Sequence, residues 1–343
     1  MRAVAPGFVD LQVNGFAGVD YNDPAVANEA VAGSIRRLFQ TGVTRFFPTV
    51  ITGSQERMTG ALRRMAEAKC EFLRCGMPEG SAMAGFHVEG PHISAEEGPR
   101  GAHPLAHVRP PDWKEFERWQ EAAGGEIRMV TLSPEYAGAP AYIAALARAG
   151  VVAAIGHTSA NSEQIRAAVD AGATMSTHLG NGAHTVLHKT ANYIWDQLAE
   201  DRLTASFIVD GIHIPAGFLN CALRMKGARR SVLVTDAVMP ATCAPGPYML
   251  GEMPVELLPG NRVVLRGTER LAGSALTMDR AVGNCVRWGG VSLETALEMA
   301  TVNPARAAGL SQANDLVRFE WEESSCTLTV LETVVAGERV YKV

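Results

Sequence analysis

Four side chains that can bind a metal or carry a proton each stand directly after an apolar run typical of a buried strand: Glu89, His157, His178 and Asp236. The two histidines are separated by one helical segment, so they occupy equivalent places one βα unit apart. In a parallel barrel the carboxyl ends of the strands converge on the face where chemistry is done. A lone histidine there is explained by a hydrogen bond to a loop carbonyl, but two in register favour a shared metal-ligand role.

One carboxylate and two imidazoles give three protein ligands and leave an open position for water, as in catalytic zinc sites. Asp236 lies outside this set and is the candidate proton shuttle. Gln12 and Asn14 end the first predicted strand with a period-two spacing that points both to one side. Ordinary hydrogen bonding at strand ends explains Gln12 and Asn14 equally well. Two further polar residues, Asp210 and His213, follow the seventh predicted strand.

Eight predicted strands alternate with helical segments, which favours an α/β fold of the (β/α)8 TIM-barrel type over an open sheet. Asn161 or Ser162 can cap the helix between the two histidines, whose apolar Ile165, Ala168 and Val169 have helical spacing. The predicted strands are 7–14, 45–50, 82–88, 127–132, 151–155, 173–177, 204–209 and 231–235. The predicted helices among them are 26–40, 54–68, 113–122, 141–149, the capped segment, part of 187–198, and 216–225.

After the eighth strand the pattern changes to a predicted hairpin over 252–265, helices over 277–288 and 293–300, and two strands around Gly337. We therefore predict a small β-domain made partly from the chain ends. The expected boundaries are 7–242 and 270–312 for the barrel, and 1–6, 243–269 and 313–343 for the β-domain.

The composition is that of a globular protein, with 343 residues, 47% hydrophobic residues and a net charge of −5. This balance gives no reason to expect nucleic-acid binding. No apolar run approaches the ~18 residues of a membrane span, so no membrane association is expected. The N-terminus lacks the pattern of a signal peptide, and the six cysteines form no CxxC pair. We therefore expect a reduced, cytoplasmic protein.

Eight motifs along the chain resemble the N-acetylglucosamine-6-phosphate deacetylases of the amidohydrolase superfamily. They occur in this order, from Gly7 to about Leu310: GFVDLQVNG, GFHVEGPHI, GPRGAHP, IGHTSA, STHLGNGAH, VDGIHI, LVTDAV and LAGSALTM. The most specific parts are HVEGP, GHT, THLGN and VTDA. The resemblance implies metal-dependent hydrolysis of the N-acetyl group of N-acetylglucosamine-6-phosphate, or of a related N-acetylhexosamine, in amino-sugar catabolism.

The resemblance also implies a role for individual residues. Glu89, His157 and His178 would hold the metal, and Asp236 would act as general base and then acid. The residues implied to contact the small amino-sugar substrate are His103, His213, Asn181, Gly182, Leu271 and Gly273. Many superfamily members carry His-x-His on the first strand for a second metal, whereas this chain has Gln12-Val13-Asn14. One divalent ion per chain is therefore expected, Zn²⁺ with Fe²⁺ as the alternative, and a homodimer is implied.

Two departures from the family pattern lead to further expectations. The chain begins almost at the first barrel strand, so the small β-domain is expected to be incomplete. The loop after the sixth strand lacks the arginine that binds phosphate in relatives and offers His184, His188 and Lys189. Arg100 is a possible substitute, although a solvated loop charge explains it better. A weaker phosphate preference is expected. Alternative functions are a cyclic amidase, a deaminase, or an inactive barrel that serves as a binding module.

Overall fold

The computed structural model describes residues 1–311 and 313–343, and the predicted barrel boundary at residue 312 lies outside them. Within these residues, eight strands form one parallel sheet in the order β11-β10-β9-β8-β7-β6-β5-β2. A parallel bridge between Val13, the last residue of β2, and Ala237, on the segment that follows β11, brings the two edges of the sheet together as in the predicted barrel. The strands are β2 (Phe8–Val13), β5 (Val43–Ile51), β6 (Phe86–Glu89), β7 (Ile127–Leu132), β8 (Val152–Ile155), β9 (Ala173–Ser176), β10 (Thr204–Phe207) and β11 (Ser231–Leu233).

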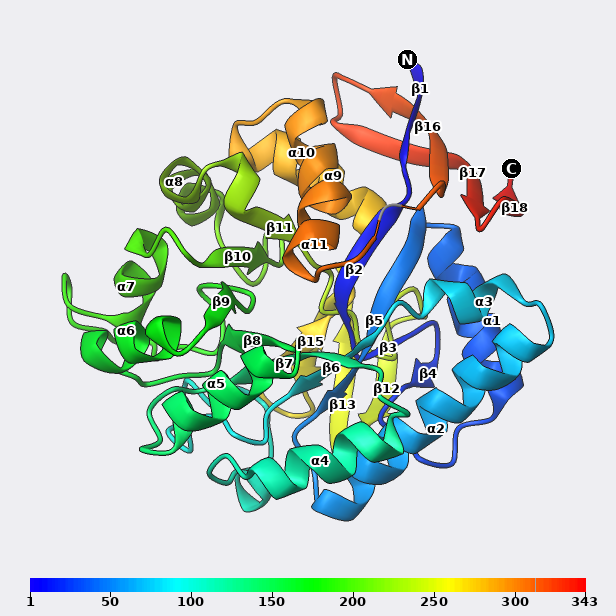
Figure 1. Ribbon diagram of the computed structural model, residues 1–343. Coiled ribbons are helices and arrows are strands. Elements are labelled where there is room, and N and C mark those ends of the chain that lie inside the picture. The colour runs from blue at the N-terminus through cyan, green and yellow to red at the C-terminus, as the bar shows by residue number, and fades with distance from the viewer. Residues whose placement is uncertain (312) are drawn as a thin grey trace.

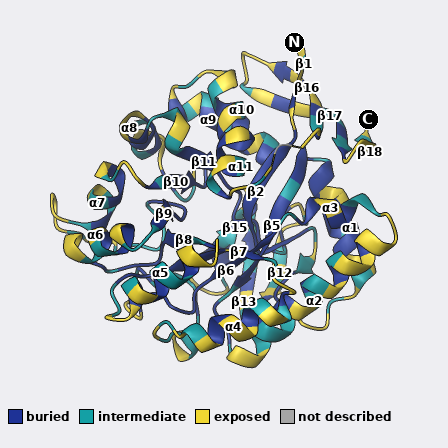
Figure 2. Ribbon diagram, in the orientation of Figure 1, coloured by how far each residue is buried: buried dark blue, intermediate teal, exposed yellow. Residues whose placement is uncertain are grey.

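Helices surround the barrel, with their exposed faces turned outward (Figures 1 and 2). Helix α6 illustrates this arrangement. Its apolar residues Ile165, Ala168 and Val169 are buried, as their spacing predicts, and Asn161 caps the helix in a capping box with Gln164. The helices are α1 (Asn28–Phe39), α2 (Gln55–Arg74), α3 (Pro78–Ala82), α4 (Trp113–Ala122), α5 (Ala139–Arg148), α6 (Ser162–Asp170), α7 (Tyr193–Ala199), α8 (Ala216–Lys226), α9 (Met278–Gly289), α10 (Leu293–Ala300) and α11 (Val302–Ala307).

The third barrel strand begins later than expected. Residues 78–82 form α3, with Pro78 in its first turn, and β6 begins only at Phe86. Helix α2 is longer than predicted because Phe72 continues the buried stripe of Met65 and Ala68 beyond the expected end at residue 68. Neither change moves Glu89, which is the last residue of β6.

The strands outside the barrel form two larger antiparallel sheets. One pairs the two chain ends, and its strands β1, β16, β17 and β18 lie together beside the two termini (Figure 1). The predicted hairpin belongs to the other, in the order β12-β13-β14-β15. The bounds are β1 (Arg2–Pro6), β16 (Leu316–Glu322), β17 (Thr327–Val335), β18 (Glu338–Lys342), β12 (Gly246–Leu250), β13 (Met253–Leu258), β14 (Arg262–Leu265) and β15 (Leu271–Ser274).

Strands β1, β12, β15 and β16 are additions to the predicted set. Because the hairpin and the chain ends lie in separate sheets, their grouping into one small β-domain stays a prediction, as do its boundaries. Two short strands, β3 (Gly15–Phe16) and β4 (Val19–Asp20), pair after β2, and two short 3₁₀ turns lie at Leu105–His107 and Ala228–Arg230.

The core lies in and around the barrel, where strand residues are buried on both faces (Figure 2). All six residues of β2 are buried, including the polar Asp10 and Gln12. Parallel strands covered by helices are expected to be buried in this way. Among the described residues, no helix combines the length and apolarity that crossing a membrane requires.

Candidate active site

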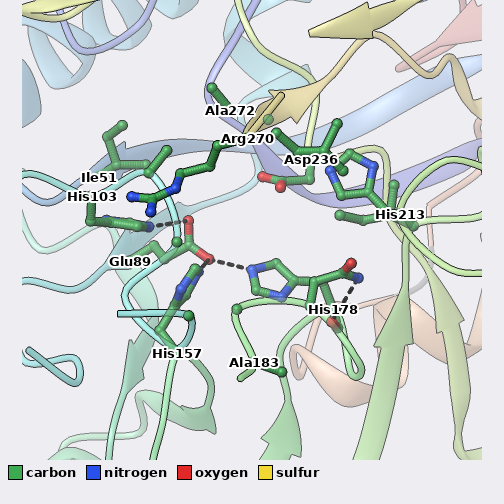
Figure 3. A pocket seen from close by; sticks show the side chains of 18 of the residues that line it. Ile51, Glu89, His103, His157, His178, Ala183, His213, Asp236, Arg270 and Ala272 are labelled. Carbon is green, nitrogen blue, oxygen red and sulfur yellow. Dashed lines mark hydrogen bonds and ion pairs between the residues drawn. The ribbon is translucent and has the colours of Figure 1, made fainter. Parts of the chain in front are cut away.

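Glu89, His157 and His178 meet at the carboxyl ends of strands β6, β8 and β9, as their positions in the sequence predict (Figure 3). The Nε2 atom of His178 lies 2.8 Å from Glu89 Oε1, and the Nε2 atom of His157 lies 3.4 Å from the same oxygen. The candidate ligand atoms of all three buried residues lie within 4.8 Å of one another. This arrangement could hold a metal ion.

The hydrogen bonds around the cluster agree with metal binding. His157 Nδ1 lies 2.8 Å from the carbonyl oxygen of Pro99, which can only accept, so this nitrogen carries the proton and Nε2 presents its lone pair to the cluster. Burial tends to raise the pKa of Glu89, but the adjacent imidazoles of His157 and His178 hold that pKa well below its usual value. A buried carboxylate kept ionised beside two imidazoles is the donor set that a divalent cation requires.

Three of the site residues have a left-handed backbone. The φ angles are 50° at His157, 30° at His178 and 49° at Asp236. A non-glycine residue rarely adopts such angles, and strain of this kind clusters at functional sites. Each of these residues stands just after a strand end, and the side chains of all three line the same cavity.

The amides of Gln12 and Asn14 hold the two carboxylates in place. Gln12 Nε2 donates to Glu89 Oε1 at 2.8 Å, and Asn14 Nδ2 donates to Asp236 Oδ1 at 2.7 Å. Both side chains therefore point to the same side of β2, as the period-two spacing indicates. Burial, reinforced by the negative charge of Glu89, raises the pKa of Asp236 to about 6. A carboxyl group with such a pKa suits general acid–base work near neutral pH.

His213 is held by Asp210, three residues before it. The two residues make a close pair, with His213 Nδ1 2.6 Å from Asp210 Oδ2. Asp210 Oδ1 accepts from the backbone N–H groups of Ile212 and His213, both at 2.8 Å. Burial tends to raise the pKa of Asp210, but the hydrogen bond and charge of His213 bring that pKa below its ordinary value. The ring of His213 is thus fixed through Nδ1 at the wall of the cavity.

His103 lies beside the metal cluster. Its Nδ1 lies 2.8 Å from Thr52 Oγ1, and its Nε2 lies 3.8 Å from Glu89 Oε2. Burial, together with the nearby His157, lowers the pKa of His103 to about 3, so its ring is neutral at physiological pH. Because Nδ1 of this neutral ring is hydrogen-bonded to Thr52, Nε2 is left to form one hydrogen bond with a ligand.

These groups line one cavity with a volume of about 780 Å³. All the residues to which the family resemblance gives a metal, proton-transfer or substrate role line it: Glu89, His103, His157, His178, Asn181, Gly182, His213, Asp236, Leu271 and Gly273. Gly182 has a φ of +55°, and a Cβ atom there would lie 2.5 Å from His157 Nδ1, so a larger residue would displace that imidazole.

The cavity wall also includes residues that the sequence analysis did not single out. Glu97 lines it from the loop after β6, and Arg270 from the segment before β15. Leu250 and Met253 line it from the β12–β13 hairpin. The sequence feature that could have drawn attention to Arg270 is its position immediately before the LAGSALTM motif. Of the suggested phosphate ligands, His184 is among the described residues that line the cavity. His188, Lys189 and Arg100 are not among them.

The sequence matches the model of the amidohydrolase family over residues 3–340. It is 35% identical to the N-acetylglucosamine-6-phosphate deacetylase of Bos taurus, over 99% of this chain and 84% of that protein. It is 32% identical to the N-acetylgalactosamine-6-phosphate deacetylase of a Shewanella species, over 98% of this chain and 82% of the relative.

A solved structure of the N-acetyl-D-glucosamine-6-phosphate deacetylase of Mycobacterium smegmatis superposes with a TM-score of 0.88. The two sequences are 33% identical, and the match covers 99% of this chain and 88% of that one. The resemblance seen in the sequence motifs is confirmed by these similarities. The chain belongs to the amidohydrolase family.

Proposed function

We propose that the protein removes the N-acetyl group of an N-acetylhexosamine 6-phosphate by hydrolysis, giving the amino sugar phosphate and acetate. N-acetylglucosamine-6-phosphate is the first candidate, in amino-sugar catabolism, and the Shewanella relative makes the galactosamine epimer the second. The observation that carries the proposal is the cluster of Glu89, His157 and His178 with Asp236 at one cavity. The names of the relatives supply the substrate class.

We propose one divalent metal ion per chain, held by Glu89, His157 and His178, with Zn²⁺ expected and Fe²⁺ as the alternative. When bound, such an ion supplies Lewis acidity, which polarises the amide carbonyl and makes water a stronger acid. Gln12 and Asn14, at the place of the second metal's ligands in many relatives, instead donate hydrogen bonds to Glu89 and Asp236. Because both amides are hydrogen-bonded to these carboxylates, they support a site with one metal ion rather than two.

Asp236 is the proposed proton carrier. Its Oδ1 accepts from Asn14, while among the described residues its Oδ2 has no hydrogen-bond partner. Oδ2 can therefore take the proton of the attacking water and deliver it to the departing amine nitrogen. The fixing of His213 Nδ1 by Asp210 supports a role for the His213 ring in contacting the carbonyl oxygen of the substrate.

Acetate release from a panel of N-acetylhexosamines, each with and without a 6-phosphate, tests the proposed function. Zn²⁺-loaded protein should release acetate, and protein treated with a chelator should not. Cyclic amides and nucleobases belong in the same screen, because a cyclic amidase or a deaminase of this family would use the same cluster with a different pocket. Turnover of one of those compounds without turnover of any acetylated sugar would overturn the proposal.

The resemblance also supports a homodimer in the cytoplasm. Light scattering of the purified protein tests the dimer, because the measured mass distinguishes one chain from two. Fractionation of the source cells tests the compartment.

A further inference from the structure

Arg270 differs from the other groups around the cavity. Of the described residues that line it, Arg270 is the one with a lysine or arginine side chain. It directly precedes β15, whose Leu271 and Gly273 also line the cavity, and its side chain extends from that side into the view of the site (Figure 3). A substrate with an anionic group therefore meets one permanent positive charge in this cavity.

The ion-pair partner of Arg270 shows which loop its guanidinium contacts. Arg270 Nη2 forms an ion pair with Glu97, on the long loop after β6. The next residue, Gly98, packs against the loop after β9, and a Cβ atom there would lie 2.9 Å from His184 Cα. Glu96 adds a contact at 3.0 Å between its Oε2 and His184 Nε2. The loop that carries Glu97 thus packs against the 181–184 loop, and Arg270 lines the same cavity as the predicted phosphate-pocket residues Asn181 and Gly182.

Of the other cations considered for this task, Lys189 and His188 do not line the cavity, and Arg100 and His184 are engaged with other partners. Arg100 Nη1 donates to the carbonyl oxygen of His103 at 2.9 Å, so Arg100 braces its own loop. His184 has Glu96 on one ring nitrogen and the hydroxyl of Tyr193 on the other, at 3.1 Å. Among the described residues, the guanidinium of Arg270 has Glu97 as its hydrogen-bond partner, which leaves most of its five donors available.

We propose that Arg270 binds the 6-phosphate of the substrate, and that Glu97 occupies the guanidinium until the phosphate displaces it. This inference rests on the proposed function and names the residue that gives it selectivity for a phosphorylated sugar. The side chains of Glu97 and Arg270 are 77% and 39% exposed, and an ion pair so exposed is weak and easily exchanged. A guanidinium binds phosphate through two parallel hydrogen bonds, which a lysine or imidazole cannot match.

Kinetics with two substrates test the proposal. Arg270→Ala should lower kcat/KM for N-acetylglucosamine-6-phosphate about ten- to a hundredfold, the effect of losing a charged hydrogen bond, and leave N-acetylglucosamine within about twofold. Arg270→Lys should recover part of the loss. Glu97→Gln should leave or improve the KM for the phosphorylated sugar, because the competing carboxylate is gone. Arg266→Ala is the matched control, since Arg266 is an exposed arginine in the same sheet region that does not line the cavity.

An equal loss for both sugars in Arg270→Ala and Glu97→Gln would overturn the proposal, because the ion pair would then be a structural latch between two loops. Calorimetry separates this outcome from failure of the proposed function. Glucosamine-6-phosphate should bind the wild-type protein at least about tenfold more tightly than glucosamine, and Arg270→Ala should abolish that difference. Phosphate preference that persists in Arg270→Ala contradicts the role of Arg270, whether or not the wild-type protein releases acetate.

Discussion

The floor and the rim of the cavity are built in opposite ways. On the floor, Glu89, His157, His178 and Asp236 are each at most 8% exposed and stand at strand ends. On the rim, side chains are paired loop to loop: Glu96 with His184, and Glu97 with Arg270. The glutamate of each rim pair is more than half exposed.

This difference assigns different tasks to the two regions. A buried polar group that loses its partner pays the full cost of its desolvation, so the floor stays in one arrangement and is preorganised for a reaction. An exposed ion pair contributes about 0–1 kcal/mol, so the rim can exchange one partner for another at little cost. We therefore expect substitutions on the floor to change the rate and metal content, and those on the rim to change substrate preference.

The largest effect is expected from His178→Ala. Removing one of three ligands should lower both the bound metal and the turnover, because three protein ligands define a site of this kind. Elemental analysis after reconstitution with Zn²⁺ should give about one ion per wild-type chain and far less for the variant. His107→Ala, which removes a histidine that does not line the cavity, is the control and should keep its metal. About two ions per wild-type chain, both needed for activity, would contradict a single site.

The next largest effect is expected from Asp236→Asn. An amide cannot accept the proton of the water, and general acid–base help is typically worth ~10²–10⁴-fold in rate. Because Asp236 is not one of the three clustered ligands, the variant should keep its metal, unlike His178→Ala. Steady-state acetate release and metal content, measured on the same sample, check both parts. A variant that kept more than about a tenth of the wild-type kcat would exclude Asp236 as the shuttle.

The floor could be predicted from the sequence because its residues follow local patterns. Each stands directly after an apolar run, and parallel strands bring such positions to one face. Strand β16 could have been found in the same way, because its buried residues alternate with exposed ones. Strand β12 was harder to find, since it begins with Gly246-Pro247, and both residue types are rare in strands.

The rim could not be predicted in this way. Glu97 and Arg270 are 173 positions apart, and nothing in the sequence near either residue indicates the other. Their pairing depends on how a long loop and a separate sheet sit over the finished barrel. The pair of Asp210 and His213, only three positions apart, was visible in the sequence as two polar residues after a strand, but the geometry of its hydrogen bond was not.

An intermediate effect is expected from Asp210→Asn, which alters the support of a cavity residue while leaving the floor intact. Loss of the charged hydrogen bond to His213 should lower kcat/KM about ten- to a hundredfold, with metal content unchanged. His213→Ala should cost a similar factor, and the double variant little more, because the two residues act as one unit. Additive losses in the double variant would show that Asp210 acts independently of His213.

The smallest effect is expected from Glu96→Gln on the rim, which removes a carboxylate charge as Asp210→Asn does. Here Glu96 is 59% exposed and pairs with His184 at 3.0 Å, so solvent screens the pair. The free energy of unfolding should fall by no more than about 1 kcal/mol, and kcat should stay within about twofold of wild type. Denaturant unfolding and acetate release measure the two quantities. A loss of kcat as large as that in Asp210→Asn would mean that the rim is as preorganised as the floor, because an exposed, exchangeable side-chain pair cannot carry such a factor. The rate would then depend on how the loop after β6 is held against the loop after β9, and the division between floor and rim would fail.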